Sequence, residues 1–258
     1  MPTIPFHKYQ ATGNDFILID NRAGIFDANN LELVKKLCNR KFGIGSDGLI
    51  LIENDDTTDF NMIFYNPDGS KSLCGNGSRC AVNFAKSIGI ISSETTFIAF
   101  DGAHHASIKG EIVHLDMHDV QNVRHMADGM FIDTGSPHYT QFVAKVDGFD
   151  VVEEGRKIRY GGLFHQEGVN VNFIQVLNEN EIFVRTYERG VEDETLSCGT
   201  GVTASAIAAG FNNVGTNVKI HTLGGVLGVK YLKGEDNNFT NVVLSGPAKK
   251  VFEGVVEI

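Results

Sequence analysis

Cys74-Gly-Asn-Gly and Cys198-Gly-Thr-Gly are two copies of the pattern Cys-Gly-x-Gly, and each opens an alanine-containing stretch that favours a helix. A Thr-Gly pair precedes each copy at nearly the same distance, since 61 positions separate Gly13 from Cys74 and 63 separate Gly135 from Cys198. A strand-like run that ends in a tyrosine also lies upstream of each cysteine. Three landmarks in one order predict a duplicated fold of two similar domains related by a pseudo-twofold axis. The alternative is that glycine-rich turns simply recur in a chain with 29 glycines.

Strand-like runs outnumber helical ones along the chain. Runs of β-branched and aromatic residues bounded by turn residues predict strands at 16–20, 48–53, 60–66, 95–100, 111–116, 169–177 and 181–188. Helices are expected at 31–40, 77–87, 151–158 and 200–210. Because strands and helices do not alternate regularly, we expect an α+β fold with largely antiparallel or mixed sheets.

The composition is that of an ordinary globular protein. Of 258 residues, 42% are hydrophobic and 21% charged, which is enough apolar mass for a sizeable core. The net charge of −10 would repel a phosphate backbone, so we expect no nucleic-acid partner. The first ten residues lack the features of a secretory signal, and the longest apolar runs, such as 49–52, are far shorter than a membrane span. We therefore expect a cytoplasmic protein with no membrane partner.

A cysteine at the start of a helix has a definite chemical meaning. The first turn of a helix has unpaired backbone N–H groups and the positive end of the macrodipole, both of which favour an anion. The dipole supplies at most ~2 kcal/mol, which would bring the pKa of a thiol from ~8.5 to roughly 7. Near neutral pH a thiolate and a thiol can then coexist, as a reaction with two bases requires. The glycines also allow backbone amides to approach and hold a ligand carboxylate.

Other functions fit these residues less well. The stretch 199–204 matches the dinucleotide-binding fingerprint, but no apolar strand runs straight into it and no acidic residue lies about twenty positions further on. Cys74 and Cys80 have no companion pair and the histidines form no ligand motif, so we expect no metal site. A redox disulfide between Cys74 and Cys198 stays an alternative, chiefly as an inactivated form. Otherwise we expect reduced thiols, with Cys38 and Cys80 as small buried hydrophobes.

Five groups of motifs, in order along essentially the whole chain, closely resemble those of diaminopimelate epimerase. They are Thr12-Gly-Asn-Asp-Phe; Tyr65-Asn-Pro-Asp-Gly-Ser followed by Cys74-Gly-Asn-Gly-Ser-Arg-Cys; Gly135-Ser-Pro-His; Val169-Asn-Val-Asn-Phe; and Tyr187-Glu-Arg-Gly followed by Glu194-Thr and Cys198-Gly-Thr-Gly. The resemblance implies an epimerase without a cofactor, built of two domains that each wrap a sheet around a central helix, with the active site between them. It implies domains at 1–119, completed by about 247–258, and at 120–246.

The resemblance also implies a two-base mechanism. The Cα–H of an amino acid is far less acidic than any protein side chain, and no pyridoxal lysine motif is evident. One thiolate would remove the proton while the opposing thiol donates another, and the resemblance gives these roles to Cys74 and Cys198. Backbone amides of the two motifs would hold the carboxylate at the reacting centre, and domain closure would exclude water. These amides belong to Gly75, Asn76, Gly199 and Thr200.

Side chains outside the two cysteine motifs are implicated by the same resemblance. The substrate-binding set comprises Asn14, Asn66, Ser136, Asn170, Glu188 and Arg189. Arg189 would pair a distal carboxylate and Glu188 an ammonium, while His138 would tune the protonation of a thiol. His138 and Glu188 are therefore grouped with the two cysteines as catalytic. Asn170 has independent support, because apolar residues alternate with it and place it on the opposite face of a strand.

Two positions depart from the pattern expected of the family. Ser136 stands where an asparagine is expected, and Gly48 stands where some members place a glutamine, so side-chain contacts with the substrate change there.

These residues favour epimerisation of LL- to meso-diaminopimelate, which supplies lysine and cell-wall precursors. The partner is then a small-molecule substrate, and the resemblance makes a homodimer plausible. Two alternatives stay open. One is a racemase of another amino acid, of the proline racemase type. The other is a non-catalytic module that binds a ligand or senses redox state through the same thiols.

Overall fold

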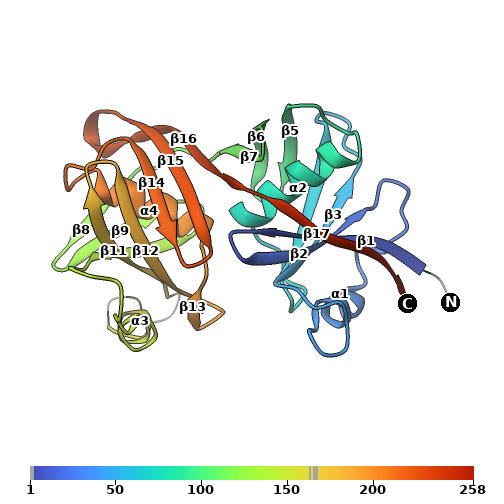
Figure 1. Cartoon of the computed structure of the whole chain (residues 1–258), viewed down its shortest axis with the longest axis horizontal. Helices are drawn as coiled ribbons and strands as arrows, with labels where there is room; N and C mark the ends of the chain where they lie inside the picture. The colour runs from blue at the N-terminus through green and yellow to red at the C-terminus, as the bar shows by residue number, and fades with distance from the viewer. Residues whose placement is uncertain (1–2, 163, 165–167) are drawn as a thin grey trace. The chain divides into compact units, whose positions relative to one another are not determined.

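The computed structural model describes residues 3–162, 164 and 168–258. The chain folds into two compact units, Met1–Leu115 together with Gly246–Ile258, and Asp116–Ser245 (Figure 1). The second unit is one continuous stretch of chain. The first is completed by the C-terminal strand β17 (Lys249–Glu257), which pairs antiparallel with β1 (Thr3–Ala11).

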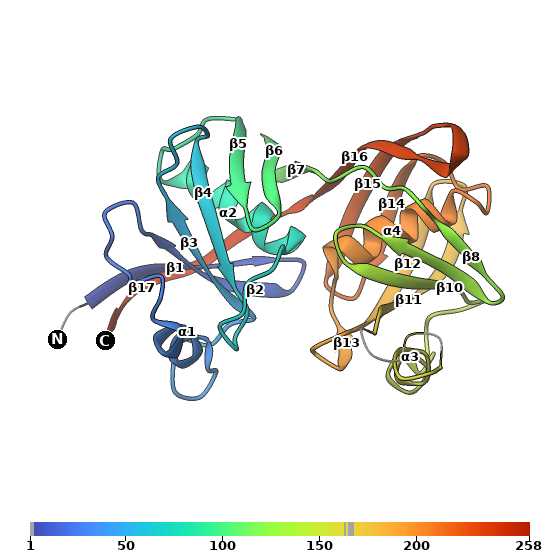
Figure 2. The same cartoon turned by 180° about the vertical axis from the view of Figure 1, so that it is seen from behind.

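The first unit is a mixed sheet around one helix. Along the chain it contains β1, β2 (Asn14–Asp20), α1 (Leu31–Cys38), β3 (Gly48–Glu53), β4 (Phe60–Tyr65), α2 (Gly75–Ser87), β5 (Glu94–Ala99), β6 (Gly102–Lys109), β7 (Ile112–Asp116) and β17. Neighbouring strands follow the order β17-β1-β2-β3-β4-β5-β6-β7. The pairs β2–β3 and β4–β5 are parallel and the others antiparallel. α2 packs against strands β1 to β4 and β17 and lies among them in both views (Figures 1 and 2).

The second unit repeats this topology strand by strand. It contains β8 (Arg124–Met126), β9 (Gly129–Asp133), β10 (Pro137–Phe142), α3 (Val151–Arg159), β11 (Asn170–Asn178), β12 (Glu181–Glu188), β13 (Asp193–Thr195), α4 (Gly199–Ala209), β14 (Asn217–Thr222), β15 (Gly225–Lys233), η1 (Glu235–Asn237) and β16 (Phe239–Pro247). The order β8-β9-β10-β11-β12-β14-β15-β16 has its parallel pairs, β10–β11 and β12–β14, at the same places as the first unit. The predicted α+β fold of two similar halves is therefore confirmed.

The central helix α4 is buried on all sides, and α2 is buried except at Asn83 and its last residues. Every residue of α4 is buried, and its sequence of glycine, alanine, serine, threonine and two branched apolar residues allows strands to approach it all round. The buried hydroxyls of Thr203 and Ser205 donate to carbonyls one turn back in the helix, Gly199 O at 3.0 Å and Gly201 O at 2.7 Å. Such back-bonding satisfies polar groups that no water reaches.

The outer helices α1 and α3 are capped in the ordinary way. The side chain of Asn30 accepts from the N–H of Leu33, and that of Asp150 accepts from the N–H of Glu153. α1 contributes buried side chains to the core of the first unit, and α3 contributes Val151 to the core of the second. In the described part of the chain, no helix combines the length and the apolar character needed to cross a membrane.

Several element boundaries differ from the sequence-based expectation. α2 begins at Gly75 and α4 at Gly199, before the expected starts at 77 and 200, because the cysteine itself is the N-cap. α1 ends at Cys38 instead of 40, since Asn39 has an extended backbone. Strands were not predicted at 3–11, 102–109, 124–126, 129–133, 193–195, 217–222, 225–233, 239–247 and 249–257. Most of these interleave exposed and buried residues, but β17 has no buried residue.

Candidate active site in two half-sites

The N-terminal half-site is built on Cys74, which is the N-cap of α2. Its backbone is extended (φ −137°, ψ 108°), and its Sγ accepts a hydrogen bond from the N–H of Gly77 at 3.4 Å. A sulfur here occupies the place where a serine or aspartate oxygen usually caps a helix. The free N–H groups of the first turn and the helix dipole therefore act directly on this sulfur and favour its thiolate.

A chain of side-chain amides lies beside Cys74. Asn76 Nδ2 donates to Asn14 Oδ1 at 3.1 Å, and Asn14 Nδ2 donates to Asp47 Oδ2 at 2.7 Å. The Sγ of Cys74 lies 3.8 Å from the same Asn14 Oδ1. Because a carboxylate only accepts, the Asn14 amide nitrogen faces Asp47 and its oxygen faces the cysteine. Asp47 in turn pairs with Arg40 at 2.6 Å. The structure thus brings the predicted residues Asn14, Asn76 and Cys74 together.

Asn66 is placed differently, in the loop between β4 and α2. Its Nδ2 donates to the hydroxyl oxygens of Ser70 at 3.0 Å and Ser72 at 3.2 Å, and its backbone N–H donates to Ser70 O at 2.8 Å. These bonds shape the turn that leads to Cys74. The structure therefore gives Asn66 a local role in the loop, and its contact with a substrate stays a prediction.

The C-terminal half-site is built on Cys198, the N-cap of α4, which is 8% exposed. Its Sγ lies 3.5 Å from the hydroxyl oxygen of Thr200. That oxygen is 2.9 Å from Nε2 of His138, whose Nδ1 is 3.0 Å from Nδ2 of Asn172. A buried row of polar groups therefore runs from strand β11 through β10 to the sulfur.

The hydrogen-bond partners of Asn172 determine the direction of every bond in this row. The hydroxyl of Thr186 donates to Asn172 Oδ1 at 2.9 Å, and Asn172 Nδ2 donates to the carbonyl of Tyr139 at 3.2 Å. The same Nδ2 then donates to His138 Nδ1, so the imidazole proton is assigned to Nε2 and faces Thr200. The Thr200 hydroxyl oxygen accepts the hydrogen bond from His138 Nε2–H, so the hydroxyl can donate its own hydrogen to the sulfur of Cys198. Each group thus donates toward the sulfur.

His138 itself stays neutral at physiological pH. It is wholly buried, and burial, together with the positive charge of Arg189, lowers the pKa of His138 from 6.5 to about 3. Its ring nitrogens contact Thr200 and Asn172. The sequence predicted that His138 tunes a thiol, and the geometry supplies a route through Thr200.

The residues predicted to recognise the distal part of a substrate meet around Asn170. Asn170 Nδ2 donates to Ser136 Oγ at 3.0 Å and to Pro137 O at 3.3 Å, while its Oδ1 accepts from the backbone N–H of Arg189 at 2.9 Å. The neighbouring Glu188 accepts from the hydroxyl of Thr195 at 3.0 Å, and both Glu188 and Arg189 are half-buried. Ser136 thus contacts Asn170 directly.

A sequence model of the diaminopimelate epimerase family matches residues 6–123 and 130–251 of the chain. The diaminopimelate epimerase of Flavobacterium psychrophilum is 52% identical over 255 residues, which cover 97% of this chain and 99% of that protein. The chain belongs to the diaminopimelate epimerase family. The resemblance drawn from the cysteine motifs is therefore confirmed. The enzyme of the same name from Chlorobaculum tepidum is 39% identical over 262 residues, with 95% of this chain and 98% of that protein covered.

Solved structures share the fold at low sequence identity. A protein of the PhzF phenazine biosynthesis family from Bacillus anthracis has a TM-score of 0.81 at 15% identity and covers both chains fully. A hydroxyproline epimerase from Agrobacterium vitis has a TM-score of 0.69 at 14% identity, covering 99% of this chain and 91% of that one. At such identities the likeness describes the fold alone.

Sequence reasoning missed several residues of the two half-sites. Asp47 orients the N-terminal half-site and Asn172 the C-terminal one. The Thr134 hydroxyl donates to the carbonyl of Thr200 at 2.9 Å, so the second Thr-Gly pair contacts the first turn of α4. The alternation that singled out Asn170 puts Asn172 on the same face, so this signal was available. Packing explains why position 48 is a glycine, since a Cβ there would lie 2.3 Å from Cε2 of Phe64.

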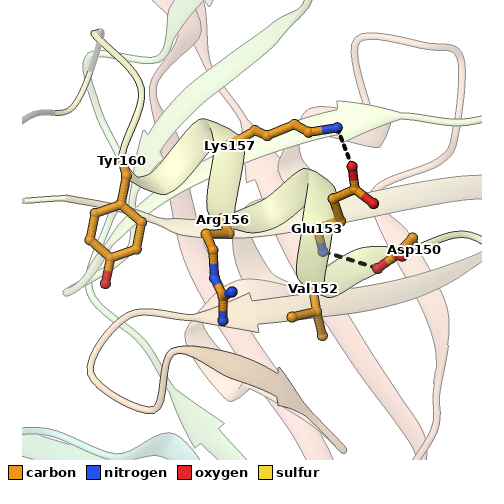
Figure 3. A pocket seen from close by; sticks show the side chains of 6 residues that line it. All are labelled: Asp150, Val152, Glu153, Arg156, Lys157 and Tyr160. Carbon is orange, nitrogen blue, oxygen red and sulfur yellow. Dashed lines mark hydrogen bonds and ion pairs between the residues drawn. The ribbon is translucent and has the colours of Figure 1, made fainter.

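An open hollow of about 600 Å³ lies elsewhere, on the outer face of α3, and neither cysteine lines it (Figure 3). Its side chains are engaged with one another, since Asp150 caps the helix and Lys157 pairs with Glu153 at 2.7 Å. Paired charges of this kind on one exposed helix are typical of a solvated surface. We therefore place the chemistry at the cysteines.

Proposed function

We propose that the chain interconverts LL- and meso-2,6-diaminopimelate by a two-base thiol/thiolate mechanism that needs no cofactor. Family membership makes the chain an isomerase with diaminopimelate epimerase activity, and lysine biosynthesis is the process that this activity serves. The observation that carries the mechanism is that each of two repeated units presents one cysteine as the N-cap of its buried central helix. The roles of individual residues are the proposal.

In the proposed reaction, one cysteine thiolate takes the proton from Cα and the other cysteine, as a thiol, donates a proton to the opposite face. The C–H bond breaks as an S–H bond forms on the first sulfur, while the second sulfur gives up its proton to carbon and becomes the thiolate. No net proton is consumed, and the configuration of Cα is inverted. Acid–base catalysis of this kind requires both sulfurs to lie within reach of one carbon, on opposite faces.

The negative charge that develops at Cα spreads into the adjacent carboxylate. Hydrogen-bond donors aimed at that carboxylate would stabilise the charge as it forms. The first-turn N–H groups of the two central helices are such donors, because no carbonyl within the helix accepts them. These groups belong to Gly75, Asn76, Gly199 and Thr200.

The distal amino-acid group of diaminopimelate distinguishes this substrate from simpler amino acids. The cluster around Asn170 offers Arg189 for a carboxylate and Glu188 for an ammonium, and Asn14 and Asn66 complete the proposed set. Ser136 takes part through Asn170, because its hydroxyl accepts from the Asn170 amide. A guanidinium binds a carboxylate bidentately, so Arg189 supplies both affinity and orientation.

The setting of the enzyme is part of the proposal. The four cysteines, Cys38, Cys74, Cys80 and Cys198, are not joined in disulfides, which suits a reducing compartment such as the cytoplasm. The product would supply lysine and cell-wall precursors. The homodimer implied by the resemblance stays a prediction, which the mass in solution from light scattering would check.

Exchange with labelled solvent tests the proposed reaction. In tritiated water the protein should introduce tritium at Cα of LL-diaminopimelate and leave L-proline unlabelled. Labelling of proline instead would favour the racemase alternative, and absence of label in every amino acid would favour the binding module. Label without formation of the meso isomer would contradict the two-base mechanism, because it would show exchange on a single face.

A further inference from the structure

Glu192 is an unusual residue in the turn that follows β12. Its backbone is left-handed, with φ at +58°, a conformation that glycine, asparagine and aspartate adopt far more readily than glutamate. The turn begins with Glu188 and Arg189, which the proposed function assigns to the distal part of the substrate. A long charged side chain at a position suited to glycine therefore needs an explanation in terms of what that side chain contacts.

Glu192 is bonded to the turn through its carboxylate and through its backbone. Its Oε1 accepts from the backbone N–H of Gly190 at 3.1 Å, and its own N–H donates to the carbonyl of Glu188 at 2.8 Å. The residue between these two is Arg189, whose backbone N–H donates to Asn170 Oδ1 at 2.9 Å. The backbone is therefore held by hydrogen bonds at Arg189 and on both sides of it.

Two groups outside the turn hold the carboxylate of Glu192 in place. The hydroxyl of Tyr187 on β12 donates to its Oε2 at 3.0 Å, and the guanidinium of Arg159, the last residue of α3, pairs with its Oε1 at 3.2 Å. Gly155 allows α3 to lie this close to β12, since a Cβ there would be 2.4 Å from Cβ of Tyr187. The side chains of Arg159 and Glu192 are only 13% and 30% exposed, so water screens their attraction incompletely.

Glu192 carries its charge at physiological pH. Burial alone would raise the pKa of its carboxyl group, but hydrogen bonds from Gly190, Tyr160 and Tyr187 act in the opposite direction. The positive charge of Arg159 adds to these bonds, and the pKa of Glu192 lies below its usual value. Hydrogen bonds to an ionised carboxylate are stronger than those to a neutral acceptor, so an amide at this position would hold the turn less firmly.

Arg159 also supports the side chain of Arg189. A Cβ at Gly168 would lie 1.8 Å from Nη1 of Arg159, so this guanidinium packs directly against the backbone of Gly168. The carbonyl of Gly168 accepts from Nη1 of Arg189 at 3.4 Å. Arg159 therefore contacts both Gly168, which binds the guanidinium of Arg189, and Glu192, which binds the backbone beside it.

We propose that Glu192 and Arg159 form a positioning pair, which fixes the turn 188–190 and so presents the guanidinium of Arg189 to the distal carboxylate of the substrate. The inference deepens the proposed function and rests on it, because it takes the role of Arg189 from there. The distal carboxylate keeps its charge and its place while the bonds at Cα change. The pair therefore contributes to binding equally before and during the reaction, which affects KM and not kcat.

Steady-state kinetics with LL-diaminopimelate test the positioning pair. We expect Glu192→Gln, Glu192→Gly and Arg159→Met each to raise KM about fivefold while kcat changes less than about twofold. Glu192→Gly is the sharpest variant, because glycine suits the left-handed backbone and a loss of affinity there cannot come from backbone strain. Glu192→Asp keeps the charge and tolerates this backbone, so it should restore part of the affinity. Circular dichroism would verify that each variant is folded; if one is not, the others serve for the same comparison.

Glu194→Gln is the matched control, because it makes the same chemical change two positions further along the chain. Glu194 forms a bidentate ion pair with Arg185, with both distances 2.6 Å and both side chains 16% exposed. Arg185 in turn donates to the carbonyls of Val146 and Phe149, so this pair holds a different loop. Glu194→Gln should lower the thermal unfolding temperature more than Glu192→Gln does, because its pair is more buried, yet leave KM unchanged.

A double-mutant cycle separates positioning of Arg189 from a direct contact between Glu192 and the substrate. Arg189→Ala should itself raise KM, and adding Glu192→Gly to it should raise KM no further, because the turn then has no guanidinium to present. A further fivefold rise in the double variant would overturn the inference, since Glu192 would then act independently of Arg189. An unchanged KM in a folded Glu192→Gly protein would also overturn it, and so would an equal rise in Glu194→Gln.

Failure of this inference is distinguishable from failure of the proposed function. A wild-type protein that introduces no tritium into diaminopimelate would remove the function, whatever the variants do. An Arg189→Ala variant with unchanged KM would remove the distal role of Arg189 and the inference with it. If wild type labels diaminopimelate and Arg189→Ala raises KM, an unchanged KM in Glu192→Gly overturns the positioning pair alone.

Discussion

The two units share one topology, yet they support their cysteines with different chemistry. In the N-terminal unit a row of donors runs from the buried cation Arg79 through Asn76 and Asn14 to the carboxylate of Asp47, so the row begins and ends on a charge. In the C-terminal unit the row runs from Thr186 through Asn172, His138 and Thr200 to the sulfur, and every member is neutral. The duplicated fold provides two equivalent helix starts, and the side chains around them make the two sulfurs inequivalent.

The largest expected effect removes one sulfur from either half. Cys74→Ala and Cys198→Ala should each lower the epimerisation rate by at least about a thousandfold, since a two-base reaction fails without either proton carrier. The measurement is the conversion of LL- to meso-diaminopimelate, separated by chromatography, alongside circular dichroism to confirm the fold. Cys38→Ala, at a buried thiol outside both half-sites, is the control and should retain activity. Full activity in either active-site variant would show that the reaction does not need a cysteine from each unit.

A smaller effect is expected on stability when alanine replaces Gly77 or Gly201, the second glycine of each cysteine motif. A Cβ at Gly201 would lie 2.4 Å from Asn172 Oδ1, which is held by Thr186, whereas a Cβ at Gly77 would meet Ile50 Cδ1 at 3.3 Å. Gly201→Ala should therefore destabilise the protein by about 2 kcal/mol, within the usual cost of overpacking, and displace Asn172 from His138. Gly77→Ala should cost less than about 1 kcal/mol, because one methyl group can move a few tenths of an ångström.

Urea unfolding of the two alanine variants, followed by circular dichroism, would measure this difference. Equal losses would mean that the C-terminal row of hydrogen bonds is no more tightly held than its N-terminal counterpart.

The smallest effect concerns pH and belongs to the C-terminal unit. The pKa of His138 is about 3 in the folded protein and near 6.5 when unfolded. The unfolded chain therefore binds more protons between these values, and the stability due to neutral His138 is complete above pH 6.5 and falls as the pH drops below it. His138→Gln carries no such titration. The difference in unfolding free energy between wild type and His138→Gln should shrink by roughly 1.4 kcal/mol from pH 7.5 to pH 5.5.

Urea titrations at the two pH values check this difference. A gap that stays constant with pH would show that His138 has the same pKa in the folded and unfolded protein, and that burial does not keep the folded imidazole neutral at pH 5.5.

Much of the fold was predictable because its signals are local. The strands β3, β4, β11 and β12 are dense in β-branched and aromatic residues, and the expected ranges agree with the structure to within a few positions. The strands β15, β16 and β17 were not predicted, since β15 and β16 interleave buried positions with more exposed ones and β17 has no buried residue. Such strands become recognisable only through their partners, as β17 does through β1.

The candidate site was predictable in part for the same reason. Cys74 and Cys198 were predicted as candidates because the start of a helix beside glycines is recognisable from a few consecutive residues. Asn170 was predicted because side chains alternate between the two faces of a strand. Asn172 and Arg79 were passed over. Their importance depends on burial, which arises when a sheet closes around the helix, and the composition of the motif says nothing about it.

The sequence alone determined which chemical groups are present and that each cysteine begins a helix, because capping involves neighbours within a few positions. Tertiary structure decided where the protons lie. The parallel register of β10 and β11 sets His138 beside Asn170 and within reach of Asn172, 34 positions away along the chain, and so assigns the imidazole proton to the side facing Cys198. Burial of Arg79 likewise comes from the packing of distant strands around α2, since only that packing excludes water from its side chain.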